Sequence, residues 1–194
     1  MDGVSLKISI NVSARQLIND ELLAIVTAAL NSSGADPRNI ILEITESAVT
    51  HERDKAGQVL QALKALGLQL AIDDFGTGYA SLANLKALPV DHVKIDQSFI
   101  RDLVTDPGDA AITRGVIAMA HGMQLSVLAE GVENEAQLDF LRACHCDEVQ
   151  GYYLAHAMPA EDLVRWVNDR KAQAAAAPSE QRSDDNIPAP LRLH

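Results

Sequence analysis

The stretch LQLAIDDFGTGYASL, residues 68–82, contains a complete connection from a strand to a helix. Its first half is an apolar run, typical of a buried strand, that ends in the adjacent carboxylates Asp73 and Asp74. The glycine-containing segment 76–78 follows, and a helical pattern begins near residue 80. Two negative charges at the end of a buried strand predict either a site for a positively charged group or a turn with a helix cap.

Strands and helices alternate along the rest of the chain. Short apolar runs predict strands at residues 6–12, 39–45, 68–73, 91–96, 125–131 and 147–152. Helical patterns follow them, at residues 20–34, 53–66, 80–88, 109–122, 133–144 and 160–171. This alternation indicates an α/β fold with parallel strands that are joined by right-handed crossovers.

Polar residues at the carboxyl ends of the strands distinguish between two α/β architectures. Each predicted strand ends in at least one of them: Asn11, Glu43, Glu46, Asp73, Asp74, Lys94, Asp96, Glu130, Glu133 and Gln150. A doubly wound sheet gathers its site at one switch point, whereas a barrel gathers residues from many strand ends. We therefore predict a TIM-type (β/α) barrel with six βα units visible. Since a closed barrel has eight strands, the first two are expected to be missing.

Composition limits the class of protein. The chain has 194 residues, of which 47% are hydrophobic, and we predict one barrel domain over residues 1–170 and a disordered tail over 171–194. No apolar run is long enough for a membrane span. The net charge of −11 argues against binding of duplex nucleic acid, which requires a basic face. Cys144 and Cys146 are read as free thiols, which places the protein in the cytoplasm.

The polar residues at the strand ends are oxygen donors of the kind that hard divalent cations prefer. Asn11, Glu43 and Asp73 are candidate ligands, and Asp74 and Glu130 add two more carboxylates. So many carboxylates would not all stay ionised at one barrel mouth without cations. Two ions that share a carboxylate would bind a phosphodiester and activate a water molecule.

Lys94 and Asp96 are expected to act beside the carboxylates. Two residues apart on one strand, they face the same side, so Asp96 could orient Lys94 toward the attacking water. The alternative is structural: an acidic residue at a strand end is commonly a helix cap, and Lys94 with Asp96 could be a solvated pair. Coincidence at six successive strand ends is the weaker explanation.

Six ordered motifs resemble those of a known family. NVSARQL (11–17), LEITES (42–47), DDFGTGYASL (73–82), VKIDQSFI (93–100), VLAEGVEN (127–134) and QGYYLAHAMP (150–159) are similar to the motifs of the bacterial EAL-domain cyclic-di-GMP phosphodiesterases. The resemblance covers roughly residues 5–168. It implies a (β/α)8 barrel that hydrolyses cyclic di-GMP to linear pGpG with two Mg2+ or Mn2+ ions, in a signalling pathway that controls biofilm formation.

The resemblance also implies roles for individual residues. Metal ligands would be Asn11, Glu43, Asp73, Asp74 and Glu130, with Asp73 shared between the ions and Glu130 acting either as ligand or as general base. Lys94, supported by Asp96, would contact the catalytic water. Gln150 and Glu133 would line the substrate pocket, and Glu46 with Thr45 would anchor the loop 73–82, which closes over the site and takes part in homodimer contacts.

One motif of the family is absent. The Glu-Ala-Leu motif belongs to the second barrel strand, and this chain begins at what would be the third. The chain therefore resembles a barrel truncated at its N-terminus: a fragment or misassigned start, a degenerate domain, or a barrel completed by another chain. A fused or upstream sensory or GGDEF domain would belong to the full protein. Because the motif supplies a metal ligand, we expect the chain by itself to have little phosphodiesterase activity.

Three functions compete. The first is metal-dependent phosphodiester hydrolysis, and the second is a non-catalytic module that binds cyclic di-GMP or regulates through dimerisation. Retention of nearly all the ligands favours the first. The third is an enolase-like enzyme with carboxylates on Mg2+ and a lysine base, which Asn11 and the loop 73–82 disfavour.

Overall fold

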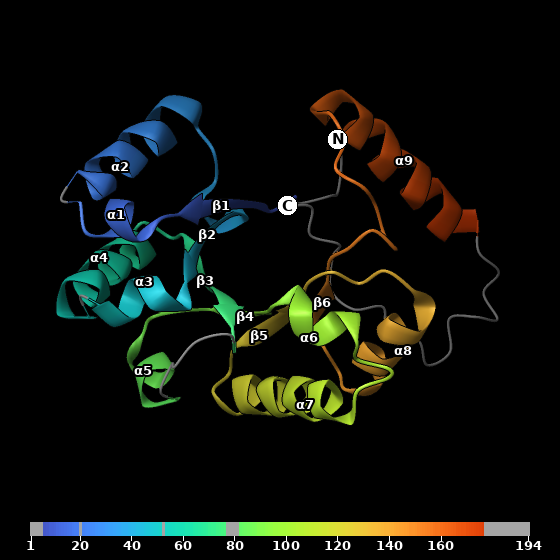
Figure 1. Cartoon of the computed structure of the whole chain (residues 1–194). Helices are drawn as coiled ribbons and strands as arrows, with labels where there is room; N and C mark the ends of the chain where they lie inside the picture. Colours follow the sequence, from blue (N-terminus) through green and yellow to red (C-terminus); the bar gives the residue numbers. More distant parts are fainter. Residues whose placement is uncertain (1–5, 20, 52, 77–81, 177–194) are drawn as a thin grey trace.

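Six parallel strands form one sheet in which each strand pairs with the next strand along the chain (Figure 1). This computed structural model describes residues 6–19, 21–51, 53–76 and 82–176. The strands are β1 (Ile8–Val12), β2 (Ile40–Thr45), β3 (Gln69–Phe75), β4 (His92–Ile95), β5 (Ser126–Ala129) and β6 (Glu148–Val149). A doubly wound sheet reverses its strand order at the switch point, whereas a barrel keeps the sequential order. The predicted TIM-type barrel architecture is therefore confirmed, with six consecutive βα units present.

The helices lie around the outside of the strands (Figure 1). The main ones follow their strands in turn and are α2 (Leu22–Ser33), α4 (Arg53–Ala65), α5 (Leu82–Ala87), α7 (Pro107–Gly122), α8 (Glu135–Ala143) and α9 (Ala160–Ala176). Shorter helical segments are α1 (Ala14–Leu17), η1 (Pro37–Asn39), α3 (Glu46–His51) and α6 (Gln97–Arg101). None of the helices in the described ranges is long and apolar enough to cross a membrane.

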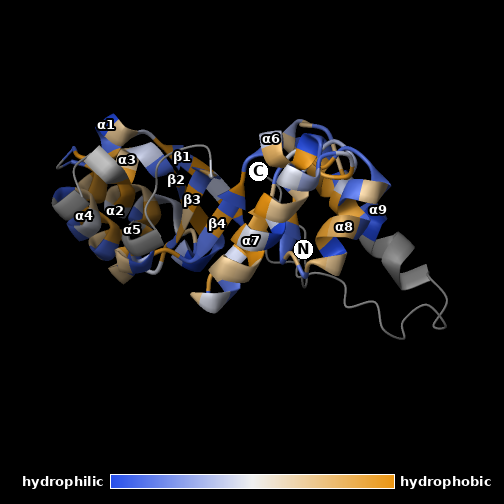
Figure 2. Cartoon of the chain, turned by 60° about the horizontal axis from the view of Figure 1, so that its bottom comes forward, coloured by the Kyte–Doolittle hydropathy of each residue, from blue (hydrophilic) through white to orange (hydrophobic). Residues whose placement is uncertain are grey.

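The core lies between the strands and the inner faces of the helices. All four residues of β4 are buried, as are the four central residues of β2, because the sheet is covered along these strands. Along α7 the buried positions recur at helical spacing: Ala110, Thr113, Val116, Ile117 and Ala120. Figure 2 shows that apolar and polar residues are interspersed along this helix. This packing fixes where each strand ends, and thereby fixes the positions of the polar residues at the strand ends.

The structure differs from the sequence expectation at several boundaries. Two short helices lie where no helix was predicted: α3 begins directly after β2, and α6 begins one residue after β4. Five or six residues carry too little periodicity to be recognised in the sequence. The helix α7 begins at Pro107 rather than residue 109, since Asp106 caps it and proline suits the first turn. Helix α9 continues past the expected domain boundary at residue 170, to Ala176.

Two sequence predictions fall outside the described residues. One concerns the glycine-containing loop, at positions 77–81, and the other concerns the expected tail, at residues 177–194. The loop and the tail therefore stay predictions.

Candidate functional site

The carboxyl ends of β2, β3, β4 and β5 bring three carboxylates around one lysine. The Nζ atom of Lys94 lies 2.6 Å from Glu43 Oε2, 2.8 Å from Glu130 Oε1 and 3.0 Å from Asp73 Oδ1. These are the lengths of charge-assisted hydrogen bonds. Only 5% of the Lys94 side chain is exposed, and Glu43 is equally buried. Side chains predicted from four separate motifs therefore meet at one point.

Among the described residues, the carboxylates at this point outnumber the cations that contact them. Burial favours the neutral amine, but the hydrogen bonds that Lys94 donates to Glu130 and Glu43 outweigh this effect and raise the pKa of Lys94, so the lysine is an ammonium. Burial also raises the pKa of Glu130, although Lys94 opposes this. One ammonium faces three carboxylates, and a fourth carboxylate, that of Asp74, belongs to the residue next to Asp73 in β3. A further positive charge at this point would therefore be stabilised by the excess of carboxylates.

A β-bulge explains how Asp73 and Asp74 serve one site. Successive side chains of a regular strand point to opposite faces. In the pairing of β3 with β4, Ile72 lies opposite Val93 and Phe75 opposite Ile95, so that two aspartates oppose the single residue Lys94. Asp74 takes the left-handed backbone conformation, with φ of 56°. The bulge thus turns both carboxylates toward the barrel mouth.

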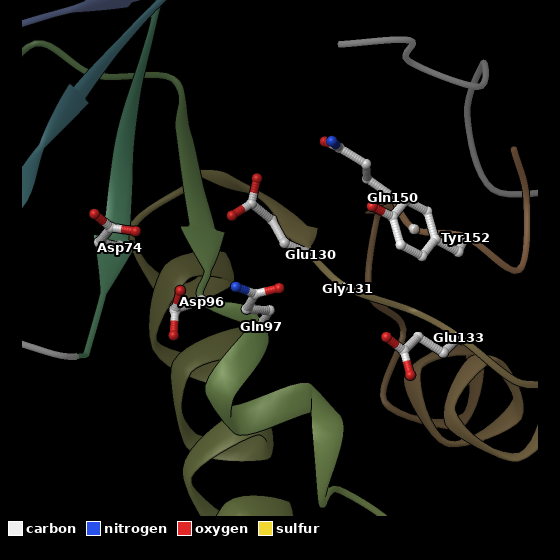
Figure 3. Close-up of a pocket in the computed structure, with 9 residues that line it drawn as sticks. Asp74, Asp96, Gln97, Glu130, Gly131, Glu133, Gln150 and Tyr152 are labelled. Carbon is white, nitrogen blue, oxygen red and sulfur yellow. The ribbon is translucent and has the colours of Figure 1, made fainter. Parts of the chain in front are cut away.

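A pocket of about 320 Å³ adjoins the carboxylates (Figure 3). Five of its lining residues were predicted as site residues: Asp74, Asp96, Glu130, Glu133 and Gln150. Figure 3 shows Asp74, Asp96 and Glu130 at one end and Gln150 and Glu133 at the other. The pocket therefore extends from the acidic cluster along the ends of β5 and β6.

Four further lining residues were missed by sequence reasoning: Gln97, Gly131, Gly151 and Tyr152. Gln97 was passed over because it carries no charge, although it directly follows Asp96. A Cβ atom at Gly131 would lie 2.6 Å from Gln97 Cβ, so the absent side chain lets the two loops approach. Gly131 lies in the motif VLAEGVEN and Gly151 in QGYYLAHAMP, so their places in these motifs were the sequence signal that could have identified them as pocket residues.

The remaining predicted residues lie around the cluster. Asn11 pairs in register with Glu43 at the end of β1, but it is exposed. Glu46, which begins α3, is buried, and its Oε2 accepts a hydrogen bond from the Gly76 N–H at 3.3 Å. Thr45 Oγ1 lies 3.3 Å from Ser47 Oγ. Glu46 thus contacts the last described residue before positions 77–81 of the loop, and its role as the anchor of the loop stays a prediction.

Asp96 does not occupy the position that was expected for it. Its Oδ1 accepts the Ser98 N–H at 3.0 Å and thereby caps α6. Within the described ranges, no hydrogen bond or ion pair connects Asp96 to Lys94. Asp96 faces the pocket beside Asp74 instead, and it contributes to the raised pKa of that carboxyl, after burial and Asp73. The helix cap, which was the structural alternative, is therefore present.

The motifs and the geometry agree with the comparison to known proteins. The sequence profile of the EAL domain matches residues 1–157. The chain belongs to the EAL domain family. Among relatives, the bifunctional diguanylate cyclase/cyclic di-GMP phosphodiesterase MucR of Pseudomonas aeruginosa is 43% identical over 157 residues, which are 81% of this chain and 23% of MucR. The cyclic di-GMP phosphodiesterase NbdA of the same species is 41% identical over 88% of this chain and 22% of NbdA.

Solved EAL domains have the same fold. The phosphodiesterase of MucR in complex with c-di-GMP superposes with a TM-score of 0.78 at 43% identity, covering 81% of this chain and 64% of that one. The EAL domain of Mycobacterium smegmatis DcpA gives a TM-score of 0.76 at 38% identity, covering 89% and 75%. This EAL domain spans about a fifth of the length of the two curated relatives.

The bulge leads to a prediction about stability in metal-free buffer. Burial and the charges of Asp73 and Asp96 raise the pKa of Asp74, so its ionisation opposes folding. We expect Asp74→Asn to raise the urea midpoint at pH 7, because asparagine tolerates the left-handed conformation without the charge. Acidification through the raised pKa neutralises the wild-type carboxyl, so the difference should shrink as the pH falls.

Urea unfolding with EDTA at pH 7 and at pH 4 tests this, with the exposed Asp139→Asn on α8 as the control for loss of one negative charge. The interpretation is contradicted if the urea midpoints of Asp74→Asn and wild type are equal at pH 7, or if their difference increases on acidification.

Proposed function

We propose that this EAL domain hydrolyses cyclic di-GMP to linear pGpG with two Mg2+ or Mn2+ ions. The observation that carries the proposal is the convergence of Glu43, Asp73 and Glu130 on one cationic point beside a pocket. EAL phosphodiesterases depend on metal ions in general. The relatives MucR and NbdA are named as cyclic di-GMP phosphodiesterases, and this supports the choice of substrate.

The donor set fits hard divalent cations. Carboxylate oxygens are the ligands that Mg2+ and Mn2+ prefer, and the three that meet at Lys94 already converge on a positive charge. Asn11, Glu43 and Asp73 would hold one ion, Asp74 and Glu130 would hold the other, and Asp73 would also serve the second ion. When bound, the ions would lower the pKa of a water molecule and offset the charge of the phosphodiester.

The protein's own residues bind and orient the substrate. Lys94 is placed to direct the attacking water and to offset negative charge as the phosphorus–oxygen bond breaks. Water adds across one of the two phosphodiester linkages, so a 5′-phosphate remains on one nucleotide and a free 3′-hydroxyl on the other. We assign Gln150 and Glu133 to the substrate, because both line the pocket beyond the acidic cluster. Asp96 fixes the start of α6 beside the same pocket.

A binding or regulatory module is the second candidate. Its support is Asn11, which is exposed on β1 although it is assigned as a metal ligand. In that case the pocket would bind cyclic di-GMP without cleaving it. Homodimerisation and fusion to a sensory or GGDEF domain are further proposals, the latter in keeping with the bifunctional name of MucR. The free thiols of Cys144 and Cys146 support our proposal of a cytoplasmic location.

Product analysis separates the two candidates. The full chain is incubated with cyclic di-GMP and Mn2+, the nucleotides are separated by chromatography, and binding is measured in parallel by equilibrium dialysis with Ca2+ in place of Mn2+. We expect slow formation of pGpG that stops in EDTA. Binding without pGpG would favour the module, and neither binding nor product would contradict both candidates.

A further inference from the structure

The ammonium of Lys94 occupies the point where the candidate metal ligands meet. Its partners come from three different strands or strand ends, and two of them, Glu43 and Asp73, are assigned to the same ion under the proposed function, on which this inference rests. We propose that Lys94 is an internal counter-ion that keeps these carboxylates together before metal binds, and that the incoming cation must displace it from Glu43 and Asp73.

Geometry makes the two cations alternatives. The Lys94 Nζ atom is 2.6 Å from Glu43 Oε2 and 3.0 Å from Asp73 Oδ1, so the ammonium takes up the space between the two oxygens. A divalent ion held by both oxygens would need that same space. Two positive charges at so short a distance repel strongly in a buried site. Metal binding therefore requires Lys94 to break two of its three bonds.

The third bond, to Glu130, keeps Lys94 in the site after the first ion has displaced it from Glu43 and Asp73, as long as the second ion has not taken Glu130. Glu130 Oε1 lies 2.8 Å from Lys94 Nζ, and Glu130 also lines the pocket that Figure 3 shows. Unlike Glu43, which is buried toward the carboxyl end of β2, Glu130 is half-buried at the pocket wall. Movement of Lys94 toward Glu130 would bring the ammonium to the side of the pocket. The same lysine thus serves the metal-free site first and the substrate pocket afterwards.

A purely structural ion pair is the alternative. Lys94 would then stabilise the fold and have no effect on metal affinity. The arrangement argues against this, since in the described part of the chain the ammonium contacts three carboxylates from three different strands or strand ends, more than one ion pair needs. If Lys94 and the metal compete for the same carboxylates, removing the Lys94 charge should lower the stability of the metal-free protein and raise its affinity for metal.

The test is Lys94→Met, which keeps a similar length without the charge. The dissociation constant for Mn2+ is measured by titration with detection of free Mn2+ by electron paramagnetic resonance, and the thermal midpoint is measured in EDTA. We expect the midpoint in EDTA to fall and Mn2+ to bind at least about tenfold more tightly, a change equivalent to about 1.4 kcal/mol. Lys64→Met is the matched control, because Lys64 pairs with Asp91 at 2.6 Å, away from the site. It should lower the midpoint and leave Mn2+ affinity unchanged.

A second variant, Lys94→Gln, is used in case Lys94→Met does not fold. Lys94→Gln is neutral but still donates hydrogen bonds to a carboxylate, and it should also bind Mn2+ more tightly than wild type. Unchanged or weaker Mn2+ binding by the neutral variants overturns the inference while the proposed function stands. A wild-type chain that shows the competition but does not cleave cyclic di-GMP contradicts the proposed function alone. If neither wild type nor variants bind Mn2+, both are contradicted.

Discussion

We expect the substitution Asp73→Asn to weaken Mn2+ binding by at least about 100-fold and to lower the rate of pGpG formation by about a thousandfold. Asp73 is the carboxylate assigned to both ions, and asparagine removes its charge without changing its size. Loss of groups that merely support metal ligands already costs 10–100-fold in affinity, so loss of a shared ligand should cost more. Mn2+ titration of the purified chain measures the first effect.

The matched control is Asp139→Asn, which removes an exposed carboxylate on α8. It should leave Mn2+ affinity within about twofold of wild type, because exposed charges are screened by salt. The Asp73 assignment fails if its substitution leaves Mn2+ affinity unchanged, or if the Asp139 variant loses as much.

We also expect Gly151→Ala to lower the free energy of unfolding by about 3 kcal/mol or more. A Cβ atom at this position would lie 2.1 Å from Val132 O and 2.3 Å from Val132 N. Both are backbone atoms, and both already form hydrogen bonds, to Tyr153 N and Gln150 O respectively. The extra methyl group must therefore separate the loops that follow β5 and β6, which is costlier than ordinary overpacking. Urea unfolding measures the change.

The control for Gly151 is Gly115→Ala on α7. Gly115 is exposed, and a Cβ atom there meets nothing within 4 Å. Alanine is the better helix former by about 1 kcal/mol, so this variant should be more stable than wild type. A Gly151 variant within about 0.5 kcal/mol of wild type would show that the loops tolerate the methyl group and would contradict their close approach.

The barrel could be predicted from the sequence because two independent patterns agreed. The alternation of strands and helices predicted parallel pairing. The polar residues at all six strand ends indicated that these ends lie on one face of a barrel. The sequential order of β1 to β6 confirms this reading. Glu46 is buried and accepts a hydrogen bond from Gly76, while its role as the loop anchor, which comes from the motif, stays a prediction.

The local geometry could not be predicted. In a regular strand, Asp73 and Asp74 would face opposite sides, and only the pairing with β4 reveals the bulge that brings both to the site. The same limit applies to Asp96, since residues that alternate along a strand share a face only while the strand continues, and β4 ends at Ile95. The contacts of Gly131 and Gly151 depend on loops that are distant in sequence.

The most direct measurement of the central claim is the position of Mn2+ in crystals of the full chain that are grown in EDTA and then soaked in Mn2+. Anomalous scattering locates the ion without reference to activity. We expect a peak within ligand distance of Glu43 and Asp73, roughly 2.0–2.3 Å from their oxygens, with Lys94 Nζ no longer bonded to both. A peak elsewhere, or an unchanged Lys94 with no peak among the three carboxylates, would contradict the claim that these residues form a divalent-cation site.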